Sequence, residues 1–325
     1  MNHSLPARDH GFFAALIGDG RPLFAFVALS LILCGAFALF LSVSGHFLPH
    51  DVHYLGMTAD DLCSMKQCRI VHFMFHDRVS FGGALVAIGS LYLWLVEFPL
   101  RQREPWAWLA LLTSGTIGFA SFLAYLGYGY LDVWHAVATL FLLPCFVGGL
   151  ILSFRHLPKP FSWKSIIKPG ASFPWKSAAG FGRGCLLFTA VGMVSAGATI
   201  TVVGMTNVFV PQDLGFLGLK TADLNAINPH LVPLIAHDRA GFGGALCCCG
   251  SLILCIVWCS APCRSLWQVL CVVGTIGFAA AIGVHPVIGY MDFSHLAPAL
   301  AGALIFALGL AFSFKPMFRG NPIIS

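Results

Sequence analysis

Eight long apolar stretches restrict the fold of this chain more than any motif does. Each has more than twenty residues, which is enough for a helix rising about 1.5 Å per residue to cross a hydrocarbon core of about 30 Å. In lipid, a helix satisfies its own backbone hydrogen bonds. We therefore predict an all-α integral membrane protein with eight transmembrane helices, at residues 22–45, 70–97, 106–127, 133–154, 184–205, 232–258, 266–288 and 293–314.

The composition supports the lipid bilayer as the main partner. The 325 residues are 58% hydrophobic and 10% charged, which is too little polar surface for a water-soluble globule of this size. The first stretch follows a polar segment and precedes no small-residue cleavage site, so we expect a retained helix and not a signal peptide.

The positive charges predict the orientation. Thirteen of the 18 Lys and Arg fall in the amino-terminal segment, the 2–3 loop, the 4–5 linker, the 6–7 loop and the tail. By the positive-inside rule both termini are cytoplasmic, in a plasma membrane such as the inner membrane of a bacterium. Nine of the 13 acids fall on the other side. No basic face remains for a nucleic acid, and we expect none as a partner.

The chain contains one unit twice. HDRVSFGGAL at 76–85 returns as HDRAGFGGAL at 237–246, and FLPHDVHYLGMTADDL at 47–62 matches FVPQDLGFLGLKTADL at 209–224. Constant spacing predicts two tandem four-helix repeats, and an even number of crossings makes them parallel. The expected domains are an amino-terminal segment (1–21), a first repeat (22–155), a basic cytoplasmic linker (156–183), a second repeat (184–314) and a cytoplasmic tail (315–325).

Two residue types inform packing and redox state. Paired glycines within the repeats, Gly82-Gly83 and Gly243-Gly244, predict close helix contacts. Most of the 12 cysteines lie in apolar stretches, where a thiol serves as a small hydrophobe. Cys63 and Cys68 lie in the outer 1–2 loop, where an oxidising compartment allows a disulfide, but the second copy has no such pair and the question stays open.

Ionisable residues recur near the outer helix ends of both copies. An ionisable residue in the membrane costs roughly 2.5 to 3.5 kcal/mol, so it is usually paired or functional. The candidate set is His76, Asp77, Arg78, Asp132 and His135 in the first copy and His237, Asp238, Arg239, Asp292 and His295 in the second.

Three interpretations of this set remain open. In one, the Asp–Arg pairs are an inherited structural clamp. In another, His76 and His135 face each other in the first bundle and ligate a haem iron, as do His237 and His295 in the second, with arginines on the propionates. In the last, His and Asp hold a small cation or carry protons. His285, which stands where the first copy has Tyr125, could line an asymmetric pocket.

The layout resembles the haem A synthase family of membrane oxidoreductases, with two tandem four-helix bundles, cytoplasmic termini, an outer cysteine pair and one histidine on each even-numbered helix. The resemblance implies two haems, one per half, bound by His76 with His135 and by His237 with His295. That family shows Glu-x-x-His-Arg at the second helix, where this chain has Phe73-Met74-Phe75-His76-Asp77-Arg78. Asp77 and Asp238 are then the candidate catalytic acids.

We therefore predict a protein that binds haem b, through His76, His135, His237 and His295 as iron ligands and Arg78 and Arg239 as carboxylate partners. Its function would be electron transfer or haem modification, with a redox partner or another membrane subunit. The rival functions are a proton-coupled or cation transporter, in which Asp132 and Asp292 complete a polar pocket, and a non-catalytic structural subunit.

Overall fold

The computed structural model describes residues 17–123, 130, 133–171 and 173–319. Within these residues the regular structure is entirely helical, with twelve α-helices and two short 3-10 turns and no strand. The predicted all-α class is confirmed.

Eight long helices follow the apolar stretches in order. They are α2 (Arg21–Ser44), α5 (Arg69–Glu97), α6 (Pro105–Leu123), α7 (Val133–Phe154), α8 (Ala178–Met205), α11 (Leu231–Cys259), α12 (Arg264–Ile288) and α13 (Phe293–Arg319). Seven of them, all except α6, are long and apolar enough over their described residues to cross a membrane. The chain is a multi-pass membrane protein.

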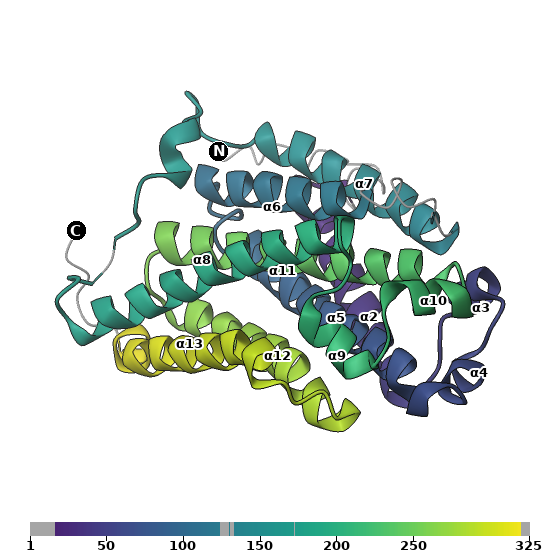
Figure 1. The fold of residues 1–325 in the computed structure, drawn as a ribbon. Helices are drawn as coiled ribbons and strands as arrows, with labels where there is room; N and C mark the ends of the chain where they lie inside the picture. Colours follow the sequence, from purple (N-terminus) through teal and green to yellow (C-terminus); the bar gives the residue numbers. More distant parts are fainter. Residues whose placement is uncertain (1–16, 124–129, 131–132, 172, 320–325) are drawn as a thin grey trace, which may run out of the picture.

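Four short helices connect the first two spans of each copy. They are α3 (Pro49–Leu55), α4 (Ala59–Cys63), α9 (Pro211–Leu217) and α10 (Thr221–Ile227), and they gather at one end of the molecule, here called the short-helix end (Figure 1). The linker, with a 3-10 turn at Trp163–Ile166, lies at the opposite end, here called the linker end.

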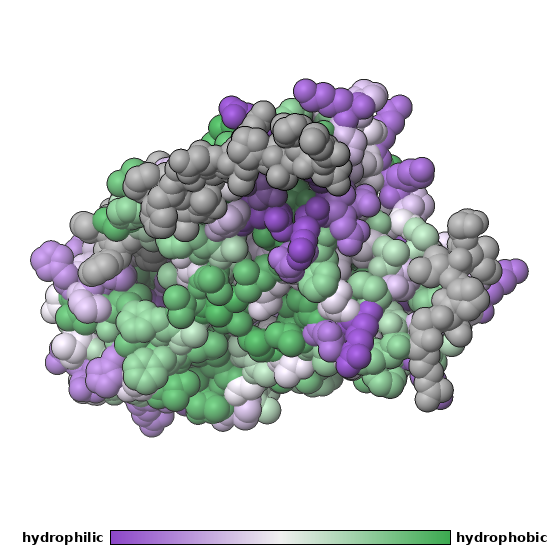
Figure 2. Space-filling model, turned by 180° about the vertical axis from the view of Figure 1, so that it is seen from behind, coloured by the Kyte–Doolittle hydropathy of each residue, from purple (hydrophilic) through white to green (hydrophobic). Residues whose placement is uncertain are grey.

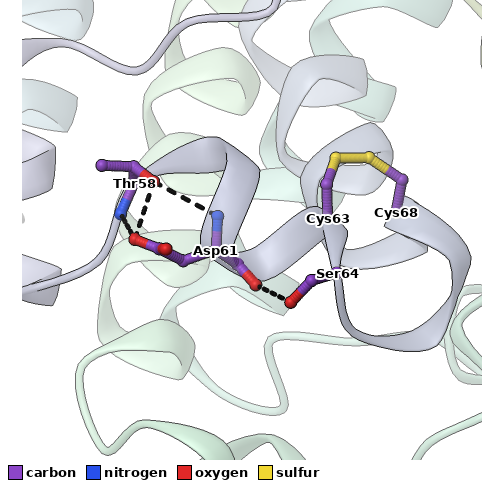
Figure 3. Close-up of a disulfide and its surroundings, with 5 residues drawn as sticks. All are labelled: Thr58, Asp61, Cys63, Ser64 and Cys68. Carbon is purple, nitrogen blue, oxygen red and sulfur yellow. Dashed lines mark hydrogen bonds between the residues drawn. A yellow bond between two sulfur atoms is a disulfide. The ribbon is translucent and has the colours of Figure 1, made fainter.

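A disulfide joins Cys63 to Cys68 at the short-helix end (Figure 3). It closes the turn between α4 and α5. Just before it, the Thr58 hydroxyl accepts from the Asp61 backbone N–H, and the Asp61 carboxylate accepts from the Thr58 backbone N–H, which forms a capping box at the start of α4. The cysteine pair that the sequence left open is therefore bonded.

The second helix of each copy lies at the centre of the molecule. In α5 and α11, 67% of the most apolar stretch of the span is buried inside the protein, whereas this share is 17–22% in the other spans. The first helix of each copy packs closely on the second through facing glycines, Gly35 with Gly82 and Gly197 with Gly243. The predicted use of glycine for close packing is confirmed at these pairs.

The third helix of each copy packs against the other copy. The indole of Trp94 on α5 donates to Ser265 on α12, and Gly83 on α5 lies against Ala280 on α12. In the same way, Gly244 on α11 lies against Ser121 on α6. The expectation that each copy forms its own bundle is therefore wrong for these helices, because small residues on α5 and α11 admit the partner copy's helix.

Two predicted boundaries also change. Helix α8 begins at Ala178, inside the expected linker, because the Ser177 hydroxyl accepts from the Gly180 backbone N–H and caps it. Helix α13 continues to Arg319, beyond the expected start of the tail at 315, and Phe318 in this added turn packs on Trp267 with 5.1 Å between ring centroids.

The surface between the two ends is largely apolar. Figure 2 shows hydrophobic residues over the middle of one face, with polar residues nearer its edges. Large apolar side chains on α2 are exposed, including Leu33, Phe37 and Phe40. Such continuous exposed apolar area is the surface that lipid covers.

Candidate metal centre

Three histidines from three helices meet near the short-helix end. They are His76 on α5, His285 on α12 and His295 on α13, and one nitrogen of each lies within 4.8 Å of the others. The closest pair is His76 Nε2 and His285 Nε2, which are 3.2 Å apart. His76 and His285 are buried and His295 is half-buried. This cluster is here called the histidine triad.

The other ring nitrogen of each buried histidine faces a hydrogen-bond acceptor. Nδ1 of His76 lies 2.8 Å from Asp77 Oδ1, and Nδ1 of His285 lies 2.9 Å from the Tyr290 carbonyl oxygen. A carboxylate and a carbonyl only accept, so both imidazoles use an N–H at Nδ1. In the neutral form of the two rings, each turns a lone pair at Nε2 toward the other ring.

Arg239 connects the triad to the second copy. Its Nε donates to Asp77 Oδ2 at 3.2 Å, and its Nη1 donates to Asp213 Oδ2 and to the Val208 carbonyl. The Tyr290 hydroxyl donates to the other oxygen of Asp213 at 2.9 Å. All of these groups are buried. The contacts therefore form a closed ring that returns to His285 through the Tyr290 carbonyl.

An equivalent network, with the roles of the two copies exchanged, surrounds Arg78 and is here called the Arg78 network. Its Nε donates to Asp238 Oδ2 at 2.7 Å, and its Nη1 lies 2.7 Å from Asp51 Oδ2. Nδ1 of His237 lies 3.0 Å from Asp238 Oδ1, and the Tyr130 hydroxyl donates to Asp51 at 2.8 Å. Each arginine thus joins the Asp of the other copy's HDR sequence to an Asp of its own copy's loop.

The two tyrosines remain hydroxyl donors. Burial and the adjacent Asp213 carboxylate raise the pKa of Tyr290, and burial and the Asp51 carboxylate raise that of Tyr130. A tyrosine with a raised pKa keeps its proton near neutral pH. Each therefore holds its loop aspartate by a neutral O–H donor while arginine holds it by charge.

The structure brings most of the predicted residues into these two networks. The triad and its ring of contacts contain His76, Asp77, Arg239 and His295. The Arg78 network contains Arg78, His237 and Asp238. Asp132 lies outside the described residues. His135 is in the first turn of α7, but its side chain is outside the described part.

Two predictions are corrected. His295 was predicted to share a site with His237 of its own copy. Its ring instead lies 5.4 Å from the ring of His76 in the other copy, because α12 and α13 reach α5. Asp292 was predicted to complete a polar pocket, but it is exposed. Its carboxylate caps α13 by accepting from the His295 backbone N–H at 2.8 Å. Hydrogen bonds from Ser294 and from that N–H lower the pKa of Asp292.

The predicted haem pair of His76 and His135 falls partly outside the described residues, and among the described ones His295 is the predicted ligand nearest to the His76 ring that has a ring contact with it. A bis-histidine iron needs two imidazole nitrogens about 4 Å apart, with a flat slot between them. The centroids of the His76 and His295 rings lie 5.4 Å apart, and the two rings are tilted by 59° to each other. The His285 ring packs beside His76 at 4.6 Å, and the Tyr290 ring packs beside His295 at 4.7 Å. Both arginines expected to hold propionates are engaged by carboxylates, Arg78 by Asp51 and Asp238 and Arg239 by Asp77 and Asp213.

Several members of the two networks are not among the predicted site residues. Asp51, Asp213, Tyr130 and Tyr290 were not singled out, and His285 was only one possible pocket residue. The signal was present in the repeat, because FLPHD aligns with FVPQD and Gly129-Tyr130 aligns with Gly289-Tyr290. The matched polar positions of the whole repeat, and not those of the HDR sequence alone, therefore indicate four of these five residues.

Comparisons with protein-family models, with curated proteins and with solved structures found no match to this chain.

Proposed function

We propose that this membrane protein binds one divalent transition-metal ion, such as Zn²⁺, through His76, His285 and His295. Neutral imidazole is a common ligand of zinc, copper, iron and nickel. This proposal replaces the predicted haem with a single ion and keeps two of the predicted histidine ligands.

The facing Nε2 atoms of His76 and His285 carry the proposal. Both Nδ1 atoms face acceptors, so in the neutral rings both Nε2 atoms present lone pairs 3.2 Å apart, an arrangement that a metal ion or a proton between them stabilises. Two bonds of about 2.05 Å to atoms at this separation enclose an angle of about 103°, close to the tetrahedral value of about 109°. A rotation of the half-buried His295 ring brings in the third nitrogen.

The surroundings match those of a metal-binding histidine. Such a histidine usually donates its other ring N–H to a carboxylate or a backbone carbonyl, which fixes the tautomer and orients the ring. Asp77 does this for His76 and the Tyr290 carbonyl does it for His285. Arg239 in turn fixes Asp77. The predicted catalytic acid Asp77 is therefore proposed as an orienting group.

Three protein ligands leave a fourth position of a tetrahedral ion open. Open positions are typical of catalytic zinc, which activates a bound water or polarises a substrate, whereas structural zinc is usually closed by four protein ligands. The chemistry we infer for this site is thus Lewis-acid catalysis or reversible ion binding.

For the whole chain we propose eight spans in two parallel copies, with α6 as the eighth, and both termini in the cytoplasm. The distribution of Lys and Arg supports this orientation. The short-helix end then faces outward, which agrees with the disulfide there, since disulfides persist in oxidising compartments. A bacterial inner membrane fits this orientation.

Metal content of the purified protein tests the proposal. After purification in a zinc-containing buffer and dialysis, we expect about one ion per chain by elemental mass spectrometry, with loss of the ion in His76→Ala and His285→Ala. His156→Ala is the control, because His156 is exposed at the linker end. His285→Gln keeps a polar side chain if the alanine variant fails to fold. Retention of the ion in a folded His285 variant contradicts the proposal.

The same preparation separates the alternatives. A Soret band that disappears in His76→Ala would support haem instead. If the protein contains neither metal nor haem, the remaining alternative is a proton shared by the two Nε2 atoms, as in proton-coupled transport. Proton flux into proteoliposomes would then be lost in His285→Gln.

A further inference from the structure

A polar cavity lies at the linker end of the first copy, whereas the histidine triad lies near the short-helix end. It encloses about 270 Å³. Its walls come from the start of α2, the loop between α5 and α6, and the end of α7. The lining residues are Asp19, Arg21, Leu100, Arg101, Arg103, Ser153, His156 and Leu157.

Positive charge predominates in this cavity. Three arginines line it against a single aspartate, and only Arg21 pairs with that aspartate, with Nε 2.7 Å from Asp19 Oδ2. Arg101 pairs with Glu97 at the exposed rim. Arg103 makes no ion pair or side-chain hydrogen bond with any described residue. The cavity therefore offers arginine N–H groups to a ligand with negative oxygens.

The corresponding place in the second copy is closed. It is bounded by the start of α8, the loop between α11 and α12, and the end of α13, with Ser313 in the position of Ser153. Phe173 from the linker lines it, and it holds about 10 Å³, which is about the space of one water. The arginine there, Arg183, donates to the carbonyls of Val257 and Trp258. The open basic cavity is thus a property of the first copy and does not follow from the fold alone.

We propose that this cavity binds the phosphate of an anionic lipid headgroup from the cytoplasmic leaflet. The cavity lies at the ends of membrane-spanning helices, on the side of the protein that carries most of the positive charge. Lipid phosphates lie at the same level of the membrane. Its volume is slightly below the range of about 300–1,000 Å³ typical of drug-sized ligands, so it suits a headgroup and not a larger soluble molecule. The inference uses the orientation proposed above and is independent of the metal.

Lipid binding to the purified full chain tests this site. The detergent-solubilised protein is titrated with phosphatidylglycerol or phosphatidylcholine, and bound lipid is measured by native mass spectrometry. We expect preferential binding of phosphatidylglycerol. Arg101→Gln and Arg103→Gln should each weaken it about fivefold, the effect expected of one basic residue at an anionic surface. Both side chains are exposed, so folding should be retained.

Lys176→Gln is the matched control, because it removes one exposed positive charge from the linker, outside the cavity. An equal loss of phosphatidylglycerol in this control would show general surface attraction and overturn the site. Inorganic phosphate at millimolar concentration distinguishes the other source of the anion. If it displaces the lipid completely and binds the cavity by itself, the ligand is a free phosphate and the lipid proposal is wrong.

Discussion

Arg239 is the residue whose removal should destabilise the fold most clearly. It is the cation between Asp77 and Asp213, and all three side chains are at most 6% exposed. Arg239→Leu leaves two buried carboxylates without their cation. Breaking a buried ion pair by removing one partner costs about 3–5 kcal/mol. At about 2–4 °C per kcal/mol for a large domain, the midpoint of thermal unfolding should fall by roughly 6–20 °C.

Thermal unfolding of the metal-free protein in detergent measures this effect. Arg101→Leu is the control, because it breaks the exposed pair with Glu97, which is worth at most about 1 kcal/mol. Adding Asp77→Asn and Asp213→Asn to Arg239→Leu removes the stranded charges and should recover part of the loss. If Arg239→Leu costs no more than Arg101→Leu, the buried network does not stabilise the fold and this reasoning is refuted.

Three further predictions test other parts of the structure. Asp77→Asn should weaken zinc affinity about 10–100-fold, the usual effect of losing a group that orients a metal-bound histidine, and competition with a zinc chelator measures it; unchanged affinity would exclude that role. Replacing Cys63 and Cys68 by serine should lower the free energy of unfolding by about 2 kcal/mol, because the loop they close is short, and denaturant unfolding in an oxidising buffer tests this. Gly83→Val should cost about 1–3 kcal/mol by crowding the α5–α12 contact, whereas Gly277→Val, which has open space around it, should cost little; equal melting temperatures would contradict the packing.

The membrane character of the protein and most of its helix positions followed from the sequence, for a physical reason. In lipid a long apolar segment has one stable backbone state, the helix, so hydropathy and length decide it locally. The ranges predicted at 22–45 and 133–154 agree with α2 and α7 to within one residue. The repeat likewise identified the HDR sequences as polar residues with a role in both copies.

Which residues share a site depended on the packing of helices that are distant in sequence. Internal repetition predicts that each copy is complete, but nothing in the matched residues says which copy supplies the neighbouring helix. Small residues such as Gly83 and Gly244 admit the other copy's third helix, and this exchange brings His285 and His295 to His76. The same exchange sets Arg239 beside Asp77. The residue types of the site could therefore be predicted from local sequence. The partners of these residues depend on contacts between the copies, which only the tertiary structure contains.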